Sequence, residues 1–189
     1  MQRRFVWCAV LLLVAALQSS TAFAIGRPFQ IGFGGGASVP VSNAADAFKT
    51  GFHGKAMVKW NAPVLPLSLR GSVGYERFNL ESLSPGTDGT GQIISGLANV
   101  AWGFPVGPIK PYLIGGLGAF NMKSQVSGTS SPSSTKFGID GGAGVEFSLG
   151  MISGFVEGRV ENIYTSDQGV GGGQPFNTRI IPVTFGIYF

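Results

Sequence analysis

The sequence predicts an all-β fold, an eight-stranded antiparallel up-and-down β-barrel that spans a membrane. The 189 residues include 31 glycines and 15 phenylalanines, while only 12% of them are charged. Segments in which large and small side chains alternate recur along the chain, and the connections between them are alternately short and long. A strand with this period of two gathers its large side chains on one face. The alternating connection lengths are typical of transmembrane barrels.

Residues 1–24 have the features of a secretory signal peptide, and we expect cleavage near Ala24. Two arginines precede an apolar run of about 13 residues that ends at Leu17, which is shorter than the ~20 residues of a membrane-spanning helix. The only cysteine, Cys8, lies in this segment. The mature domain, residues 25–189, is therefore expected to contain no disulfide and no thiolate metal site. The sequence indicates no cofactor and no metal.

Eight strands follow in order, at about 28–39, 50–60, 66–80, 92–104, 109–123, 136–148, 151–165 and 177–189. The first and sixth alternate large apolar side chains with glycine, as at Phe33 and Phe137. The fourth mixes its faces, and the fifth places Leu113 and Leu117 on the face that is expected to be polar. The eighth alternates strictly and ends on the aromatic Phe189.

The connections predict the topology. Three are short, at 61–65, 105–108 and 149–150, and four are longer and polar, at 40–49, 81–91, 124–135 and 166–176. Transmembrane barrels have short periplasmic turns and longer extracellular loops. Because the strand number is even, both termini are expected on the periplasmic side.

The two faces can be told apart by side-chain size, because eight strands enclose a lumen barely wide enough for side chains. The small and polar set is expected inside, and the large apolar set toward lipid. Aromatic residues near strand ends are expected to form two interfacial girdles; they are Trp60, Trp102, Phe104, Tyr112, Tyr75 and Tyr164, with Phe52, Phe137 and Phe189 at the same levels. A soluble lipocalin-like barrel, with its apolar residues inside, is the distant alternative.

The terminal strand, with Phe185, Ile187 and Phe189 on one face, resembles that of bacterial outer-membrane barrels, whose final phenylalanine is read by the barrel assembly machinery. The whole mature chain resembles small outer-membrane barrels of the OmpA/OmpX type or the opacity-like type. This resemblance implies an outer-membrane protein with a structural or surface-contact role and no enzymatic activity. Its implied partners are outer-membrane lipid and lipopolysaccharide, with host or cell-surface ligands at the loops. No periplasmic domain is expected after the barrel. A role in tethering the membrane to peptidoglycan is therefore not expected either.

Ten polar residues are expected to point into the lumen: His53, Lys55, Lys59, Arg70, Glu76, Asp140, Glu146, Glu157, Arg159 and Glu161. A turn at 149–150 would place Asp140 opposite Arg159 and Gly142 opposite Glu157, and His53 is expected close to Glu76. Charges in a narrow lumen should pair, because an unpaired buried charge costs several kcal/mol. The network is therefore interpreted as structural; a gate of ion pairs in a small channel is the alternative.

Two further hypotheses concern single residues. His53, the only histidine, would serve a lipid-A-modifying barrel enzyme only with a partner within ~3 Å and an orienting acid. Arg77 and Lys123, near strand ends, are expected to contact lipid phosphate. Without the two arginines of the signal peptide, the chain contains 11 Lys and Arg residues and 9 Asp and Glu residues. This net charge of +2, without basic clusters, argues against nucleic-acid binding.

Overall fold

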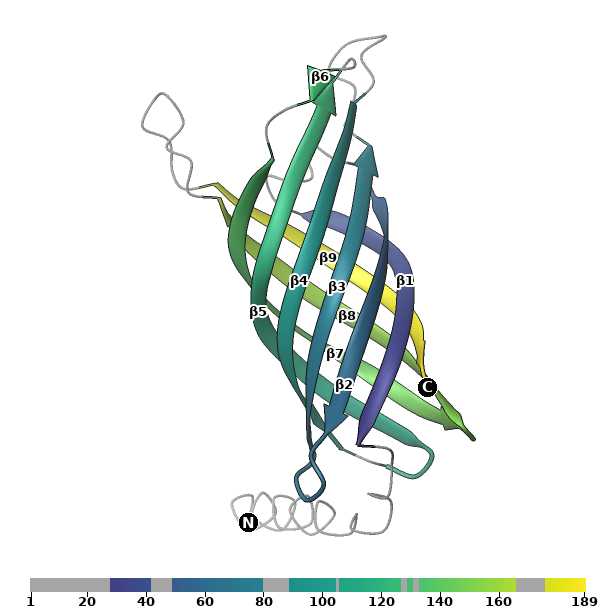
Figure 1. Ribbon diagram of the computed structural model, residues 1–189. Helices are drawn as coiled ribbons and strands as arrows, with labels where there is room; N and C mark the ends of the chain where they lie inside the picture. The colour runs from purple at the N-terminus through teal and green to yellow at the C-terminus, as the bar shows by residue number, and fades with distance from the viewer. Residues whose placement is uncertain are drawn as a thin grey trace, which may run out of the picture.

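The computed structural model describes residues 28–41, 49–79, 89–104, 106–126, 129–130, 133–165 and 176–189, which form a closed antiparallel barrel (Figure 1). The expected signal peptide and most of the four long connections lie outside the described residues. The barrel strands are β1 (Phe29–Val41), β2 (Gly51–Asn61), β3 (Leu67–Asn79), β4 (Gly89–Gly103), β5 (Ile109–Val126), β7 (Ser134–Leu149), β8 (Ile152–Thr165) and β9 (Phe176–Tyr188). The predicted eight-stranded barrel is thus confirmed; the two-residue β6 (Thr129–Ser130) only extends the end of β5.

Each barrel strand pairs with the strands before and after it, and β1 pairs with β9 to close the sheet. The register of the closing pair places Gly34 opposite Gly186. Closure leaves no barrel strand with an unpaired edge. Among the described residues, no helix is long and apolar enough to cross a membrane.

The two ends of the barrel differ. Residues 62–66, 104–108 and 150–151 connect strands at one end, which also holds the start of β1 and the end of β9 (Figure 1); we call it the short-turn end. The four longer connections join strands at the opposite end, the loop end. The predicted alternation of connections is therefore present.

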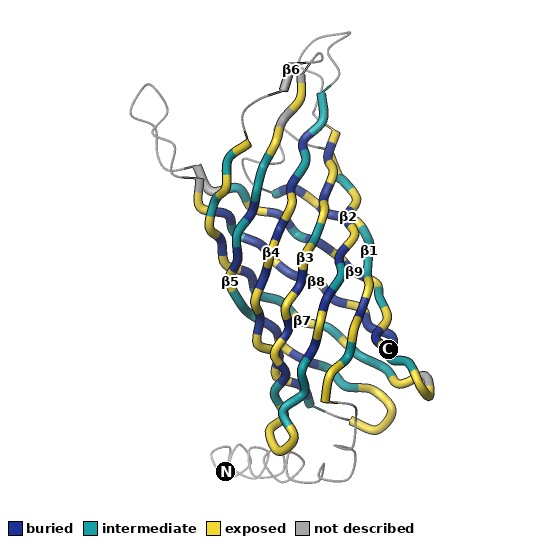
Figure 2. Tube along the Cα trace, in the orientation of Figure 1, coloured by how far each residue is buried: buried dark blue, intermediate teal, exposed yellow. Residues whose placement is uncertain are grey.

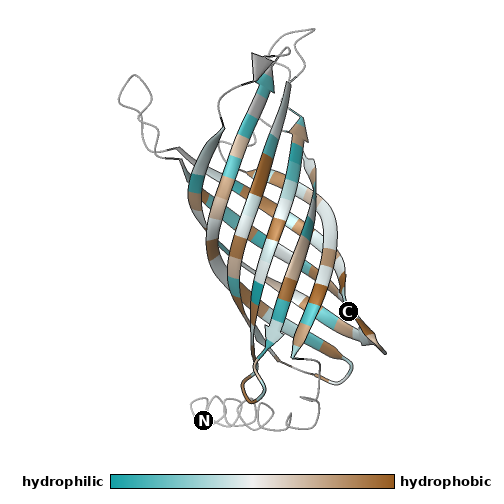
Figure 3. Ribbon diagram, in the orientation of Figure 1, coloured by the Kyte–Doolittle hydropathy of each residue, from teal (hydrophilic) through white to brown (hydrophobic). Residues whose placement is uncertain are grey.

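Burial alternates along the strands, as Figure 2 shows. On β9, Phe185 and Ile187 are exposed, while Thr184 and Tyr188 are fully buried. The exposed positions of the strands are mostly apolar (Figure 3). This arrangement suits a lipid-facing outer wall and is the one predicted, with the small and polar set inside.

The expected faces of β5 were wrong. Leu113 and Leu117 are exposed, whereas Tyr112 and Ile114 are buried in the lumen. The girdle position expected for Tyr112 is therefore corrected. Its ring fits the lumen because Gly144, its register partner on β7, has no side chain in the space that the ring occupies.

The turn between β7 and β8 lies one residue later than predicted. Leu149 pairs with Ile152, so the turn residues are Gly150 and Met151, and Gly150 adopts a φ of 75° that favours glycine. The predicted pairing of Asp140 with Arg159 and of Gly142 with Glu157 is consequently wrong. The register instead places Asp140 opposite Glu161, and Gly142 opposite Arg159. Because the shift is by two residues, every side chain keeps its predicted face.

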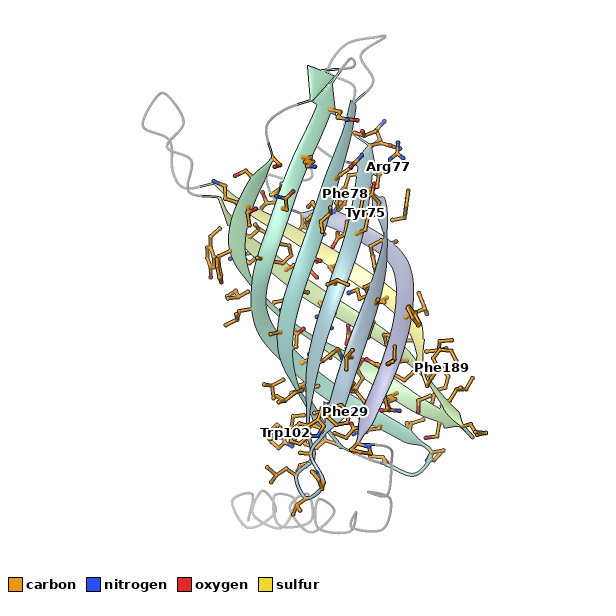
Figure 4. All side chains as sticks on the ribbon, viewed as in Figure 1. Phe29, Tyr75, Arg77, Phe78, Trp102 and Phe189 are labelled. Carbon is orange, nitrogen blue, oxygen red and sulfur yellow. The ribbon has the colours of Figure 1, made fainter. Side chains whose placement is uncertain are left out.

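The remaining aromatics of the expected girdles lie toward the two ends of the barrel. In Figure 4, Tyr75 lies toward the loop end, and Phe29 and Trp102 toward the short-turn end. Exposed or half-exposed aromatics of the expected loop-end set are Phe52, Tyr75, Phe137 and Tyr164; those of the expected short-turn set are Trp60, Trp102, Phe104 and Phe189, and Phe29 joins them. The rings of Trp102 and Phe104 are 4.7 Å apart. Their depth in a membrane stays a prediction.

Candidate functional site

All ten polar residues singled out in the sequence lie on the lumen face of the barrel, and nine of them are buried. The tenth, Glu146, keeps 14% of its side chain exposed. They come from β2, β3, β7 and β8. Five of the ten are acids: Glu76, Asp140, Glu146, Glu157 and Glu161. They are the only Asp and Glu residues in the described part of the chain, so every described acid faces the lumen.

The centre of the lumen is an ion-pair network around Glu157. The Glu157 carboxylate accepts hydrogen bonds from Arg70, from Arg159 Nε at 2.6 Å and from the Tyr112 hydroxyl at 2.8 Å. Arg159 Nη1 also donates to Asp140 Oδ2 at 3.0 Å. Two arginines thereby share two carboxylates, and each charge has an opposite charge beside it.

Asn99 on β4 fixes the geometry of this network. Its amide nitrogen donates to both oxygens of Asp140 at 2.7 Å, and its amide oxygen accepts from Arg159 Nη1 at 3.1 Å. One amide thus contacts both members of the Asp140–Arg159 pair. Side chains from β3, β4, β5, β7 and β8 are connected in this way across the lumen.

A second pair lies toward the short-turn end. Lys59 Nζ donates to both oxygens of Glu146, at 2.9 and 2.7 Å, and lies 4.4 Å from the centre of the Tyr188 ring. The Tyr188 hydroxyl donates to the sulfur of Met57 at 3.1 Å, and its ring packs 4.9 Å from that of Phe155. Aromatic rings therefore cover the charged centre on this side.

A third group, toward the loop end, surrounds His53. His53 Nδ1 lies 3.0 Å from Ser38 Oγ, and Nε2 lies 2.9 Å from Thr184 Oγ1. His53 is in register with Glu76, as predicted. Lys55, the cation of this group, is buried on the same face of β2 as His53.

An apolar cluster closes the lumen above these charges. It contains Phe78, Ile93, Leu97, Phe120, Ile163 and Ile180, with Met122 packed against it. On their strands, Phe78 and Ile163 each follow a network carboxylate, Glu76 and Glu161, in the direction of the loop end. We call this cluster the apolar plug. Sequence reasoning missed it, because its members were not separated from the lipid-facing residues by size.

Lumen glycines make room for the aromatic rings. A Cβ built at Gly32 would lie 2.5 Å from the Tyr188 ring, one at Gly186 would lie 2.4 Å from Phe155, and one at Gly144 would lie 2.5 Å from Tyr112. Real Cβ contacts are longer, so the rings occupy the space that the glycines leave. Sequence reasoning assigned glycine to the lumen but missed these ring positions; a glycine in register beside each aromatic was the available signal.

The arrangement around His53 does not form a hydrolytic triad. In a triad, the acid orients the histidine and the histidine activates the serine. Here both ring nitrogens meet hydroxyl groups, from Ser38 and Thr184, and both hydroxyl residues are fully buried. Among the described residues, no cluster of three or more metal-ligating side chains occurs.

The residues of the expected assembly signal lie on the outer wall, two of them on β9 and Phe189 directly after it. Phe185, Ile187 and Phe189 are 59%, 38% and 47% exposed. Arg77 and Lys123 are also exposed, on β3 and β5; Figure 4 shows Arg77 near the loop end.

Solved structures with the same architecture are outer-membrane barrels. Neisserial surface protein A is 21% identical to this chain, with a TM-score of 0.61 and coverage of 86% of this chain and 96% of that one. A major outer membrane protein of Thermus thermophilus is 15% identical, with a TM-score of 0.62 and coverage of 85% and 97%. Ail, the attachment invasion locus protein of Yersinia pestis, is 17% identical, with a TM-score of 0.53 and coverage of 85% and 95%. These similarities show the fold.

No curated protein matches the sequence. The family model of the outer membrane protein beta-barrel domain matches residues 8–189. The chain therefore belongs to the family of outer-membrane β-barrel domain proteins, and an outer membrane is where it resides.

Proposed function

We propose that the protein is a non-enzymatic, non-conducting structural barrel of the outer membrane that contributes to envelope integrity. The observation that carries the proposal is the filled lumen. Paired charges occupy its centre, aromatic rings cover them on one side, and the apolar plug covers them on the other. Eight strands leave space for side chains and little else.

A gate would require the central pairs to exchange partners. Arg159 contacts Asp140, Glu157 and Asn99 together, so its displacement would leave two carboxylates without this cation. Breaking one buried pair costs about 3–5 kcal/mol. Opening would also require the apolar plug to separate. Both costs favour a structural role over a channel.

An enzyme is disfavoured by the surroundings of His53. Its hydroxyl neighbours are buried beneath the apolar plug, away from lipid substrates. A general base must reach the proton that it removes. His53 is instead proposed to link β1, β2 and β9 through Ser38 and Thr184.

The orientation follows the rule for such barrels, in which short turns are periplasmic. The loop end is then extracellular, and the start of β1 and the end of β9 are periplasmic after removal of the leader. The longer loops are proposed to make surface contacts, with host or cell-surface ligands among them. Phe185, Ile187 and Phe189 are proposed as the signal for the barrel assembly machinery, because they form an accessible apolar face at the chain end.

Deletion of the protein in its native bacterium, followed by complementation, tests the proposal. We expect the deletion strain to admit more of a large hydrophobic dye, and we expect wild-type protein and His53→Ala to restore the barrier equally. Lipid A should have the same mass spectrum in all strains. A His53→Ala protein that shifts on boiling like wild type, yet leaves lipid A altered, would instead establish an enzyme.

A further inference from the structure

The charges on the outer wall are distributed unevenly. In the described strands, the charged residues of the outer face are Arg77, Lys123 and Arg179, all basic and all toward the loop end. None of them has an ion-pair partner within the described residues. The described acids, by contrast, all face the lumen. The described part of the outer wall is therefore positively charged toward the loop end.

Two of these cations belong to one row across the sheet. Arg77 on β3 pairs with Gln92 on β4, and Gln92 pairs with Lys123 on β5. One strand separates the two cations, which places their backbones about 10 Å apart. That spacing suits two separate phosphates better than a single one.

An apolar trough lies below this row, on β3, β4 and β5 and on the flanking strands β1, β2 and β7. It is a hollow of about 660 Å³ that is open to the outside, within the ~300–1,000 Å³ range of small-molecule sites. Its floor includes Ala56, Gly71, Gly96 and Ala98, and its lateral walls include Phe33 and Phe137.

The register explains the trough. The row of paired positions from Phe33 to Phe137 crosses β2, β3, β4 and β5, with Gly96 on β4. A Cβ placed at Gly71 or at Gly96 would meet no atom within 4 Å. The hollow is thus open space in front of the sheet.

The distance between trough and cations fits an amphiphile. On β4, Gly96 lies four positions after Gln92, or about 13 Å along the strand. Tyr75 and Asn121 lie in the intermediate row, on either side of Ile94. The phosphate of such an amphiphile would contact the cations, and its polar linkage would contact the polar side chains of the intermediate row. Its acyl chain would lie in the apolar trough.

We propose that the outer wall of β3–β5 binds one molecule of a bisphosphorylated glycolipid of the lipid A class. Arg77 and Lys123 contact its phosphates, and one acyl chain occupies the trough. The choice of this lipid rests on the proposed orientation, which turns the loop end toward the outer leaflet. Charge complementarity and the apolar trough select an anionic lipid over a soluble polyanion, which has no chain to fill the trough.

Native mass spectrometry of the detergent-purified full-length mature protein, titrated with bisphosphorylated lipid A, tests the site. The variants are Arg77→Gln with Lys123→Gln, which removes the cations, and Gly96→Leu, which fills the trough. Their matched controls are Arg179→Gln, a rim cation on β9, and Gly158→Leu, an outward glycine on β8 that also faces open space. A gel shift on boiling checks that every variant is folded.

We expect one tightly bound lipid on wild type, at least about tenfold weaker binding in both test variants, and binding within about twofold of wild type in both controls. Phosphatidylglycerol and sucrose octasulfate should not compete. Equal weakening in test and control variants, or no weakening, would overturn the site. Competition by phosphatidylglycerol would overturn the lipid class, and competition by sucrose octasulfate would replace the lipid with a soluble polyanion. None of these results bears on the sealed lumen, which dye entry and conductance test separately.

Discussion

Glu157→Gln is the substitution that the lumen network should tolerate least. The residue is 1% exposed, and its carboxylate accepts hydrogen bonds from Arg70, Arg159 and Tyr112. Glutamine keeps the volume and removes the charge. Arg159 would retain Asp140, but Arg70 would lose the carboxylate that neutralises it. Removing one partner of a buried pair is expected to cost about 3–5 kcal/mol in the free energy of unfolding.

Urea unfolding in lipid vesicles, followed by the fluorescence of Trp60 and Trp102, measures this loss. With a urea dependence of about 1–3 kcal/mol per molar, the midpoint should fall by roughly 1–5 M. Glu146→Gln is the comparison, since its side chain keeps 14% exposure and one cation holds it, whereas Glu157 is held by two arginines and a tyrosine; its loss is therefore expected to cost less than that of Glu157. A Glu157→Gln midpoint no lower than that of Glu146→Gln would refute the reasoning.

Three further predictions use the same unfolding assay. Gly144→Ala places a Cβ 2.5 Å from the Tyr112 ring and should cost about 1–3 kcal/mol, whereas Gly158→Ala, which meets open space, should stay within about 0.5 kcal/mol of wild type; equal effects would contradict the glycine–ring packing. Phe120→Ala, at 0% exposure in the apolar plug, should cost about 3–5 kcal/mol, and an unchanged midpoint would show that the plug does not pack as described. Tyr112→Phe removes a hydrogen bond to a carboxylate and should cost about 1.5–3 kcal/mol; a neutral result would place the hydroxyl outside the network.

Periodicity alone could identify the strands and the lumen face of the charged residues. Because side chains alternate along a strand, the sequence shows which residues share a face. A charged residue then identifies that face as the lumen face, as Lys55 and Lys59 do on β2. The same logic failed on β5. Both of its faces carry large apolar residues, such as Tyr112 inside and Leu113 outside, so size could not distinguish lumen from lipid.

Exact pairing depended on one turn. Gly150 with its positive φ is the first residue of the β7–β8 turn, and assigning the turn one residue too early shifted every pair across that hairpin. The contacts of the network were also beyond sequence reasoning. Arg159 reaches Asp140 although Gly142 is its register partner, because long side chains bridge diagonal positions on a face.

The central claim is that the lumen is sealed by paired charges and the apolar plug. Single-channel recording of the wild-type protein in planar bilayers tests it most directly. The account predicts no discrete conductance steps from protein whose gel mobility shifts on boiling. Reproducible steps whose size changes in Asp140→Asn or Arg159→Gln would contradict it, since ions would then pass through the network described here as closed.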